Sequence, residues 1–543
     1  MKNKYIKISF ITTAVIAVIA VIAAVAVQLY GPKDADASII RTAYEVKPAP
    51  VILKDATDIY NLETQNTIWK DIEAYKAKTE YSFENPLIIE NPFQTNRQSF
   101  YLYFKTDKPS SLDYTIHVND ADISDFTRTC YNNSDNNMTT EHEYQIIGVI
   151  PDKDNEITLT LHYASGKTEA RSFTYKAPSL TGSASLILTH ENGESSEALT
   201  EGLYTVFAGD NFFYYYDNDG ILRSEIPIID YRCLRLIFQG DKMYYSAGTS
   251  TFVEMNSLGR LTNIYDLGKY AVHHDYTFDD KGNILILGTD TESDREEDRI
   301  LYLHPDTGEV SQILDLADIF PDYYVNCTPD KEGKLDWMHI NTIQWLGNDT
   351  LLLSSRETSS VLKFSNIFED PTLEYMLGTE SFWKDTPYTS YLYTKSEDFK
   401  SQLGQHSITY VKEASLKEGE YYLYMFDNNI GSSTTRPDYA WTNYFDDIGS
   451  VGNAENGEKS YFYKYLVDET SKTYKLVESF PLPYSGFMGS VQEIGENVVT
   501  NSSNPKVFEE YDKDNNLIRS FDTGSSKQAY RTYKYTFSNF YFK

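Results

Sequence analysis

A histidine and an arginine border one apolar segment of the chain and could act together on an anionic group. His339 precedes an alternating apolar run, and Arg356 closes the next one. The turn residues Gly347-Asn348-Asp349 separate the two runs, which predicts a β-hairpin. A hairpin would bring His339 and Arg356 to the same end of a sheet. An imidazole beside a permanently charged guanidinium suits acyl, phosphoryl or sulfuryl transfer.

Two further histidine motifs precede predicted strands in the same way. His273-His274-Asp275 lies before a strand that ends at the turn Asp280-Lys281-Gly282-Asn283, and Gly404-Gln405-His406 lies before another alternating run. Side chains at the starts of several strands could reach the same place as His339 and Arg356 if the strands surround a common axis. The sequence therefore offers three motifs for one site.

The elements that would position these residues are predicted to be β-strands. The chain has 543 residues with 46 Tyr and 28 Phe, and short alternating runs rich in aromatic and β-branched residues favour strands. Between residues 178 and 543, turn signals recur between such runs at intervals of roughly 40–75 residues. This length fits about six blades of a β-propeller. We predict an all-β chain with a six-bladed propeller over residues 178–543 as its catalytic domain, because loops of different blades converge on a central channel.

A smaller β-domain is predicted in front of the propeller. Residues 99–104 and 157–163 are clear alternating runs, and several such runs separated by polar turns indicate a small N-terminal β-sandwich over residues 86–177. Residues 31–85 are predicted to form a linker with a short helix.

The N-terminus carries a membrane signal. Lys2, Lys4 and Lys7 precede an apolar run from about Ile8 to Tyr30, which is long enough to cross the roughly 30 Å hydrocarbon core. We expect a signal-anchor or transmembrane helix over residues 1–30, with the remainder of the chain on the extracytoplasmic side of the cell membrane. The alternative is a cleaved signal peptide and a secreted protein.

The charge of the chain excludes one class of partner. A formal net charge of −32 argues against nucleic-acid binding, which requires a basic surface. An anionic small substrate remains compatible with this charge if the site is a local positive pocket. Cys130, Cys233 and Cys327 match no zinc or redox spacing, and no metal or organic cofactor is needed for the chemistry considered below.

Together these residues resemble the bacterial aryl-sulfate sulfotransferases, which do not use a nucleotide sulfate donor. The resemblance covers both predicted domains, and its motifs occur in the family's order. In the front domain they are Asn85-Pro86-Leu87, Phe126-Thr127-Arg128-Thr129 and Thr139-Thr140-Glu141-His142-Glu143-Tyr144. In the propeller they are His273-His274-Asp275, Asp336-Trp337-Met338-His339-Ile340-Asn341, Leu353-Ser354-Ser355-Arg356, Gly404-Gln405-His406 and Phe426-Asp427-Asn428.

The resemblance implies a six-bladed propeller with an N-terminal β-domain and transfer of a sulfuryl group from an aryl sulfate donor to a phenolic acceptor. It makes His406 the nucleophile that is transiently sulfated, and it places His339 and Arg356 on the sulfuryl oxygens. It makes one histidine of the His273-His274 pair the acid/base partner. We prefer His274, with His273 assigned to substrate binding. Asn341 would help to hold the sulfate, and a homodimer is compatible with the family.

Sulfuryl transfer through a histidine also agrees with the general chemistry of group transfer. Sulfuryl transfer should be loose, with charge on the peripheral and leaving oxygens, by analogy with phosphoryl transfer. A neutral imidazole at His406 can attack sulfur, and the resulting sulfohistidine would give ping-pong kinetics. A second histidine, with an unperturbed pKa of roughly 6.5, can protonate the leaving phenolate and deprotonate the incoming phenol.

Two other functions fit the same residues. The first is a propeller metallohydrolase in which His274, His339 and His406 bind zinc, although Arg356 beside a metal ion argues against it. The second is a non-catalytic surface propeller that only binds its ligand. Activity in the presence of a chelator separates the first alternative from sulfuryl transfer, and turnover separates the second.

Overall fold

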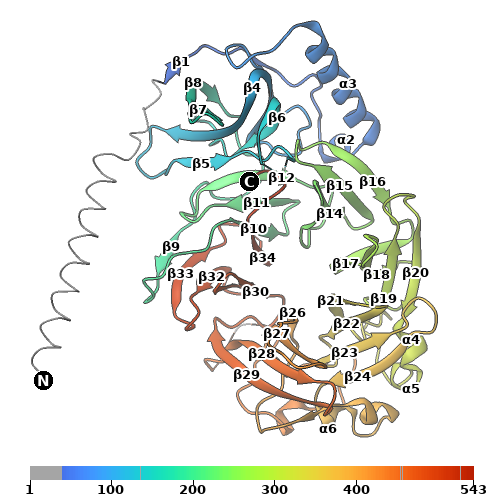
Figure 1. The fold of residues 1–543 in the computed structure, drawn as a ribbon. Helices are drawn as coiled ribbons and strands as arrows, with labels where there is room; N and C mark the ends of the chain where they lie inside the picture. The colour runs from blue at the N-terminus through green and yellow to red at the C-terminus, as the bar shows by residue number, and fades with distance from the viewer. Residues whose placement is uncertain (1–38, 135, 453, 455, 526) are drawn as a thin grey trace, which may run out of the picture.

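The computed structural model describes residues 39–134, 136–452, 454, 456–525 and 527–543. A β-domain is followed by a propeller of six sheets around a central axis, which confirms the predicted all-β architecture (Figure 1). The helix predicted over residues 1–30 lies outside the described residues. None of the helices in the described ranges combines the length and the apolar character that a membrane crossing requires.

The N-terminal domain is organised around one long strand, β4 (Ser99–Val118). Its first half pairs with β3 (Leu87–Glu90) and β6 (Thr139–Ile147), and its second half pairs with β5 (Phe126–Thr129) and β7 (Asp154–Tyr163). The domain is completed by β1 (Ile40–Arg41), β2 (Val46–Lys47) and β8 (Thr168–Lys176).

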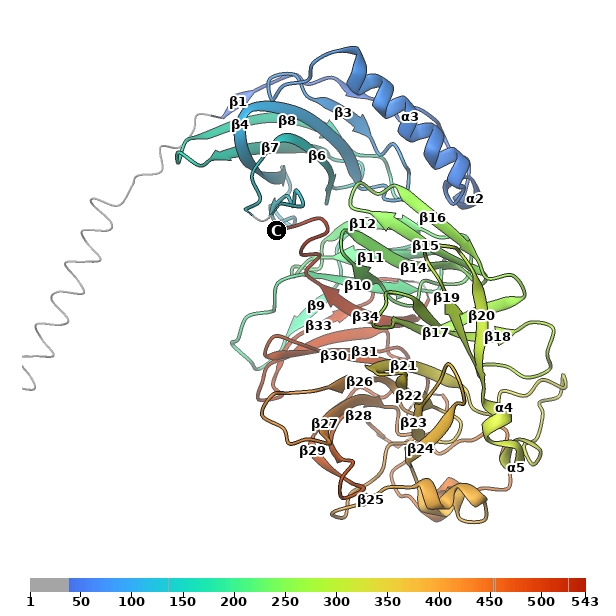
Figure 2. The ribbon, with the colours of Figure 1, turned by 45° about the vertical axis from the view of Figure 1, so that its right-hand side comes forward.

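The predicted short helix is present as α2 (Ala56–Ile59) and α3 (Leu62–Lys78), which covers the outside of this domain (Figure 2). The side chain of Asn61 caps α3 by accepting a hydrogen bond from the Thr64 amide. Ile68 and Ile72, four residues apart on one helix face, are fully buried against the sheet. The helix therefore forms because its apolar face has a sheet to cover.

The six blades follow one another along the chain, and in blades 2 to 6 the first of four consecutive strands is innermost. Blade 1 consists of β10 (Leu203–Ala208), β11 (Phe212–Tyr216), β12 (Leu222–Pro227) and, as its innermost strand, β34 (Ala529–Tyr535). Blade 2 consists of β13 (Ile237–Gln239), β14 (Lys242–Gly248), β15 (Thr251–Asn256) and β16 (Leu261–Asp266). Blade 3 consists of β17 (Tyr270–Phe278), β18 (Ile284–Asp290), β19 (Arg299–Leu303) and β20 (Val310–Asp315).

The second half of the propeller repeats this order. Blade 4 consists of β21 (Ile340–Gly347), β22 (Thr350–Ser355), β23 (Ser360–Ser365) and β24 (Thr372–Leu377). Blade 5 consists of β26 (His406–Val411), β27 (Glu420–Asp427), β28 (Ser460–Asp468) and β29 (Thr473–Leu482), with β25 (Thr394–Lys395) outermost. Blade 6 consists of β30 (Ser490–Ile494), β31 (Asn497–Ser502), β32 (Val507–Tyr511), β33 (Leu517–Asp522) and the outermost β9 (His190–Asn192). The connections include α4 (Leu316–Ile319), α5 (Pro321–Tyr324), α6 (Glu380–Trp383) and two short 3₁₀ helices, Pro387–Tyr391 and Trp441–Asn443.

Both ends of the propeller segment close the ring. The early strand β9 pairs with the outer strand of blade 6, and the late strand β34 supplies the inner strand of blade 1. The closure brings the last strand of the chain to the central axis beside β17 and β21, which are more than 180 residues earlier in sequence.

The inner strands of blades 3, 4 and 5 are irregular at their first residues. Their pairing with the second strand shifts register after Val272, Ile340 and His406. His274 and His339 have left-handed backbones with φ of +55° and +47°. Such conformations are costly for residues with a Cβ and occur mainly where the surrounding structure imposes them. The register shifts mark β-bulges in strand pairing. A β-bulge changes the direction of the side chains near it, here at the three histidine motifs.

Candidate active site

The hairpin predicted around His339 and Arg356 is confirmed. β21 and β22 pair antiparallel with Ile340 opposite Ser355, so His339 and Arg356 lie at the same end. The Arg356 amide donates a hydrogen bond of 3.2 Å to the carbonyl oxygen of His339. Arg356 is largely buried, and its one ion pair among the described residues is a 3.5 Å contact with Glu357. Its guanidinium therefore has further N–H groups to offer an anion.

The tautomer of His406 is fixed by Asn428. Nδ1 of His406 lies 2.7 Å from Oδ1 of Asn428 and 3.1 Å from the carbonyl oxygen of Gly404. The Asn428 amide group donates to the carbonyl oxygens of Ser485 (2.7 Å) and Met488 (2.6 Å), which fixes its oxygen toward the imidazole. Two acceptors facing Nδ1 require a hydrogen there, so Nε2 carries the lone pair.

His406 is also held in its neutral form. Burial lowers its pKa to about 3, against the opposing effect of the Asn428 hydrogen bond, and the nearby positive charges of His339 and Arg356 lower it further. A neutral imidazole with a free Nε2 is the nucleophilic form of histidine.

His339 has the opposite protonation state. Its Nδ1 lies 2.5 Å from Oδ2 of Asp336 and 2.9 Å from Oε2 of Glu297. Burial disfavours the imidazolium, but the two carboxylates outweigh it and raise the pKa of His339 to about 10. At neutral pH both ring nitrogens carry hydrogens, so Nε2 is a charged hydrogen-bond donor.

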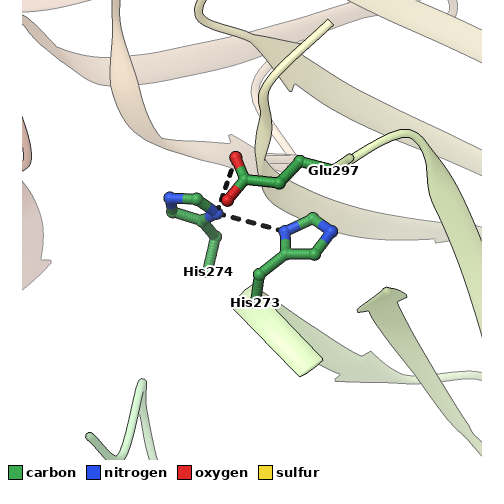
Figure 3. Close-up of side chains that lie close together, drawn as sticks. All are labelled: His273, His274 and Glu297. Carbon is green, nitrogen blue, oxygen red and sulfur yellow. Dashed lines mark hydrogen bonds and ion pairs between the residues drawn. The ribbon is translucent and has the colours of Figure 1, made fainter. Parts of the chain in front are cut away.

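His274 and His273 are adjacent in sequence and in space. Their Nδ1 atoms are 3.1 Å apart, and Nδ1 of His274 lies 3.5 Å from Oε2 of Glu297 (Figure 3). The ring of His274 lies 4.8 Å from that of His339 and 5.4 Å from that of Tyr530, measured between centroids. Burial, and then the neighbouring imidazoles, lower the pKa of His274 well below its usual value. His274 is therefore neutral and can act as a base.

Asn341 is completely buried between blades 4 and 5. Its Nδ2 donates a 2.8 Å hydrogen bond to the carbonyl oxygen of Gln405, immediately before His406. This bond uses one of the two amide hydrogens and leaves the other for a ligand. Asn341 thus ties the strand of His339 to that of His406.

A buried ion pair that the sequence did not predict links the strands next to the histidines. Arg531 donates to Oδ1 of Asp275 (2.8 Å) and to the carbonyl oxygen of Asn341 (3.1 Å), and Arg235 lies 3.2 Å from the same carboxylate oxygen. Oδ2 of Asp275 accepts a hydrogen bond from the Ile343 amide. Asp275 therefore fixes the inner strands of blades 1, 3 and 4 next to His274.

Besides Arg531, sequence reasoning gave no role to three other residues of the site, namely Glu297, Asp336 and Asn428. Asp336 and Asn428 stood inside recognised motifs, so their positions beside the histidines were a usable signal. Glu297 and Arg531 had no such signal, because only blade packing and ring closure bring them to the axis.

The donor atoms that could hold a metal ion do not match the predicted zinc site. Among the described residues, two groups of donors converge, His273 with His274 and Glu297, and Glu297 with Asp336 and His339. His406 belongs to neither group. In the described ranges of the chain, the donor atoms of His274, His339 and His406 therefore do not converge as the predicted zinc site requires.

Comparison with known families gives two matches along the chain. A family profile described as Arylsulfotransferase (ASST) matches residues 188–541, and one described as Arylsulfotransferase Ig-like domain matches residues 87–178. No curated protein matches the chain.

Among solved structures, a protein of unknown function from Bacteroides caccae is 10% identical, with 61% of this chain and 98% of that chain covered and a TM-score of 0.35. A putative 6-phosphogluconolactonase from Bacteroides fragilis is also 10% identical, with 78% and 98% covered and a TM-score of 0.34. Likenesses at this level carry no argument about this chain.

Proposed function

The chain belongs to the arylsulfotransferase family, and from this premise we propose that it transfers a sulfuryl group from an aryl sulfate to a phenol through a sulfated His406. Membership of the family makes the chain a sulfotransferase. The double displacement and the role of each residue are our proposal. The observation that carries it is the orientation of Asn428, which leaves Nε2 of His406 as an unprotonated nitrogen in a neutral ring.

In the first half-reaction the lone pair on Nε2 of His406 attacks the sulfur atom. The N–S bond forms while the bond from sulfur to the aryl oxygen breaks, and its electron pair leaves with the phenolate. The charged Nε2–H of His339 and the guanidinium of Arg356 bind the sulfuryl oxygens, where charge gathers in a loose transition state. Asn341 and His273 complete the substrate contacts.

In the second half-reaction a phenol oxygen attacks the sulfur of sulfohistidine. The neutral His274 takes the phenol proton, and the electron pair of the N–S bond returns to Nε2 of His406. The low pKa of His274 in the free site suits this step because the base must be unprotonated when the phenol arrives. In the first half-reaction the neutral His274 has no acidic proton to give, so acidic phenols, which leave as phenolates, are the expected leaving groups.

The proposed function is tested by transfer from 4-nitrophenyl sulfate to phenol with the full-length chain in the presence of EDTA. We expect nitrophenolate release that depends on the acceptor and is lost in His406→Ala. His190→Ala is a suitable control, because this exposed histidine lies on the outer strand β9. Unchanged turnover in His406→Ala would contradict the proposal.

We further propose that residues 1–30 hold the enzyme at the cell membrane, with the propeller on the extracytoplasmic side. The support is the apolar run that follows Lys2, Lys4 and Lys7. Activity that sediments with membranes, and that protease added to intact cells removes, is the expected result. Activity confined to the cytosol would contradict it.

A further inference from the structure

Glu297 is a carboxylate that faces two of the site histidines from a loop of its own. It lies between β18 and β19, and its Oε2 atom approaches Nδ1 of His339 at 2.9 Å and Nδ1 of His274 at 3.5 Å. Oε2 is buried, yet it has no aligned hydrogen-bond donor among the described residues. The Nδ1–H of His339 has a nearer acceptor, Oδ2 of Asp336 at 2.5 Å. One carboxylate oxygen is therefore open toward His274 (Figure 3).

The loop that carries Glu297 is fixed at both sides. The Glu297 amide donates to Oγ1 of Thr289 at 2.9 Å, and its carbonyl oxygen accepts from the amide of Ile340, the residue after His339, at 3.1 Å. Arg295 in the same loop forms a bidentate ion pair with Asp315 at 2.6 and 2.5 Å. A carboxylate on such a loop keeps its position, which is what an orienting group requires.

We infer that Glu297 is a positioning residue for the second half-reaction, in which it orients His274 and stabilises the imidazolium that forms when His274 takes the phenol proton. This inference rests on the proposed function. The step is balanced, since the proton moves from the phenol oxygen to Nε2 of His274, while Nδ1 of the same ring faces Oε2 of Glu297 at 3.5 Å and Nδ1 of His273 at 3.1 Å. The phenol would be the nucleophile, His274 the base and Glu297 the carboxylate that orients the base, as in a catalytic triad.

The charges around His274 show why a carboxylate is needed there. The groups that face its ring from the neighbouring elements are His273, His339, His406, Tyr530, Arg531 and Glu297. Arg531 and His339 are cations and oppose a second positive charge. Asp336 is already paired with His339, and Asp275 is paired with Arg531. Oε2 of Glu297 faces both rings, His339 at 2.9 Å and His274 at 3.5 Å, so Glu297 is the carboxylate placed to offset a charge on His274 as well.

The convergence of His273, His274 and Glu297 has the donor types of a metal site, but its charge environment opposes one. The imidazolium of His339 lies 2.9 Å from the carboxylate oxygen that a metal ion would use. A divalent cation at that oxygen would compete for it with Nδ1 of His339. A carboxylate that serves two histidines explains the same geometry without this conflict.

The inference is tested with the full-length chain carrying Glu297→Gln and Glu297→Asp. Glu296→Gln is the matched control, because that neighbour points toward Lys334 at 3.8 Å and not toward the histidines. The enzyme is first sulfated with 4-nitrophenyl sulfate, and the burst of nitrophenolate reports the first half-reaction. A series of phenols of increasing pKa is then added, and the rate of each acceptor step is measured.

We expect Glu297→Gln to slow the acceptor step by about tenfold to a hundredfold, a part of the roughly 10²–10⁴-fold that a general base contributes. The loss should grow with the pKa of the phenol, because acidic phenols need less help from a base, and Glu297→Asp should restore part of the rate. Slowing that is equal for all phenols, or no slowing, would overturn the inference. The burst in the wild type separates these outcomes from a failure of the proposed function itself.

Two measurements that need no turnover accompany the kinetics. Nitrogen chemical shifts of labelled histidine should show the proton of His274 on Nδ1 in the wild type and a changed tautomer balance in Glu297→Gln. An unchanged tautomer balance in Glu297→Gln would overturn the inference. Metal analysis of the purified chain should show no metal ion whose removal changes the acceptor step, and a stoichiometric metal that Glu297→Gln abolishes would also overturn it.

Discussion

At the scale of single residues, the site gives identical imidazole rings different charges. Burial lowers the pKa of each ring, and in His406 and His274 it prevails. In His339 two carboxylates reverse the outcome. Each ring is also held through Nδ1, by Asn428, by His273 with Glu297, or by Asp336 with Glu297. The nucleophile, the base and the cationic donor thus differ by their neighbours and not by residue type.

Asp336→Asn should change the alkaline limb of the donor reaction. In the wild type His339 stays protonated up to a pH of about 10, so kcat/KM for the aryl sulfate should be flat toward high pH and fall only near that value. The substitution removes one of the two carboxylates that raise this pKa, so the fall should begin at lower pH. The pH profile of kcat/KM measures it, with exposed Glu332→Gln in the same loop as the control. An unmoved limb would contradict the assigned charge of His339.

Asn428→Asp should change the acid limb of the pH dependence of the nitrophenolate burst. A carboxylate beside Nδ1 favours the imidazolium of His406, so its pKa should rise from about 3 toward neutrality. The imidazolium has no lone pair on Nε2, and the nitrophenolate burst should therefore be slowed more at pH 5 than at pH 8. Burst rates at the two pH values measure the change. Equal slowing at both values would show that Asn428 does not control the protonation of His406.

At the scale of elements, the starts of the inner strands position the site. The alternating pattern of residues 340–353 was enough to predict the hairpin of β21 and β22, because local periodicity and a turn determine a hairpin. The left-handed backbones of His274 and His339 could not be predicted, because they lie at irregular strand starts where the register of pairing shifts. The order of motifs predicted which histidines meet, but not which one is charged.

Gly489→Ala should disturb the site through its backbone. Gly489 precedes β30 with φ of +113°, and a Cβ there would lie 2.7 Å from the Phe426 ring. The preceding residue, Met488, holds the amide of Asn428. We expect a loss of stability of roughly 1–3 kcal/mol from backbone strain, increased by the clash of the new Cβ with Phe426, and a slower burst.

Gly240→Ala is the control for this substitution, because its φ is also positive, at +60°, but its Cβ would meet nothing within 4 Å. Urea unfolding and burst kinetics of both variants separate packing from backbone strain. Equal effects in the two variants would contradict a specific role for the strand start.

At the scale of the whole molecule, ring closure completes the site. The strand β34 supplies Arg531 and Tyr530 to the axis, 256 residues after Asp275 in the case of the arginine. No local sequence pattern relates these positions. The sequence therefore predicted six blades and a shared axis, but not the ion pair of Arg531 with Asp275 next to the histidines. The imidazolium of His339 and the guanidinium of Arg356 would give the proposed anion site a local positive charge in a chain with a net charge of −32.

Lys534→Met should weaken the closure. Lys534 on β34 forms a completely buried ion pair of 2.8 Å with Glu510 on β32 of blade 6. Removing one partner of a buried pair costs about 3–5 kcal/mol, because it leaves a buried charge uncompensated. The cost should lie at the lower end because Tyr204 and Asn497 also donate to Glu510.

The free energy of unfolding in urea measures this change, and the double variant Lys534→Met with Glu510→Gln should recover part of it. A single variant as stable as the wild type would show that the pair does not hold blades 1 and 6 together.

The central claim is most directly tested by trapping the sulfated enzyme. The full-length chain is mixed with 4-nitrophenyl sulfate without acceptor, quenched without acid to preserve an N–S bond, digested, and mapped by mass spectrometry. We predict one sulfuryl group on the peptide that contains His406, localised to that histidine, formed at the rate of the nitrophenolate burst and removed when phenol is added. A burst with the sulfuryl group on another residue, or with no modified peptide, would contradict the account.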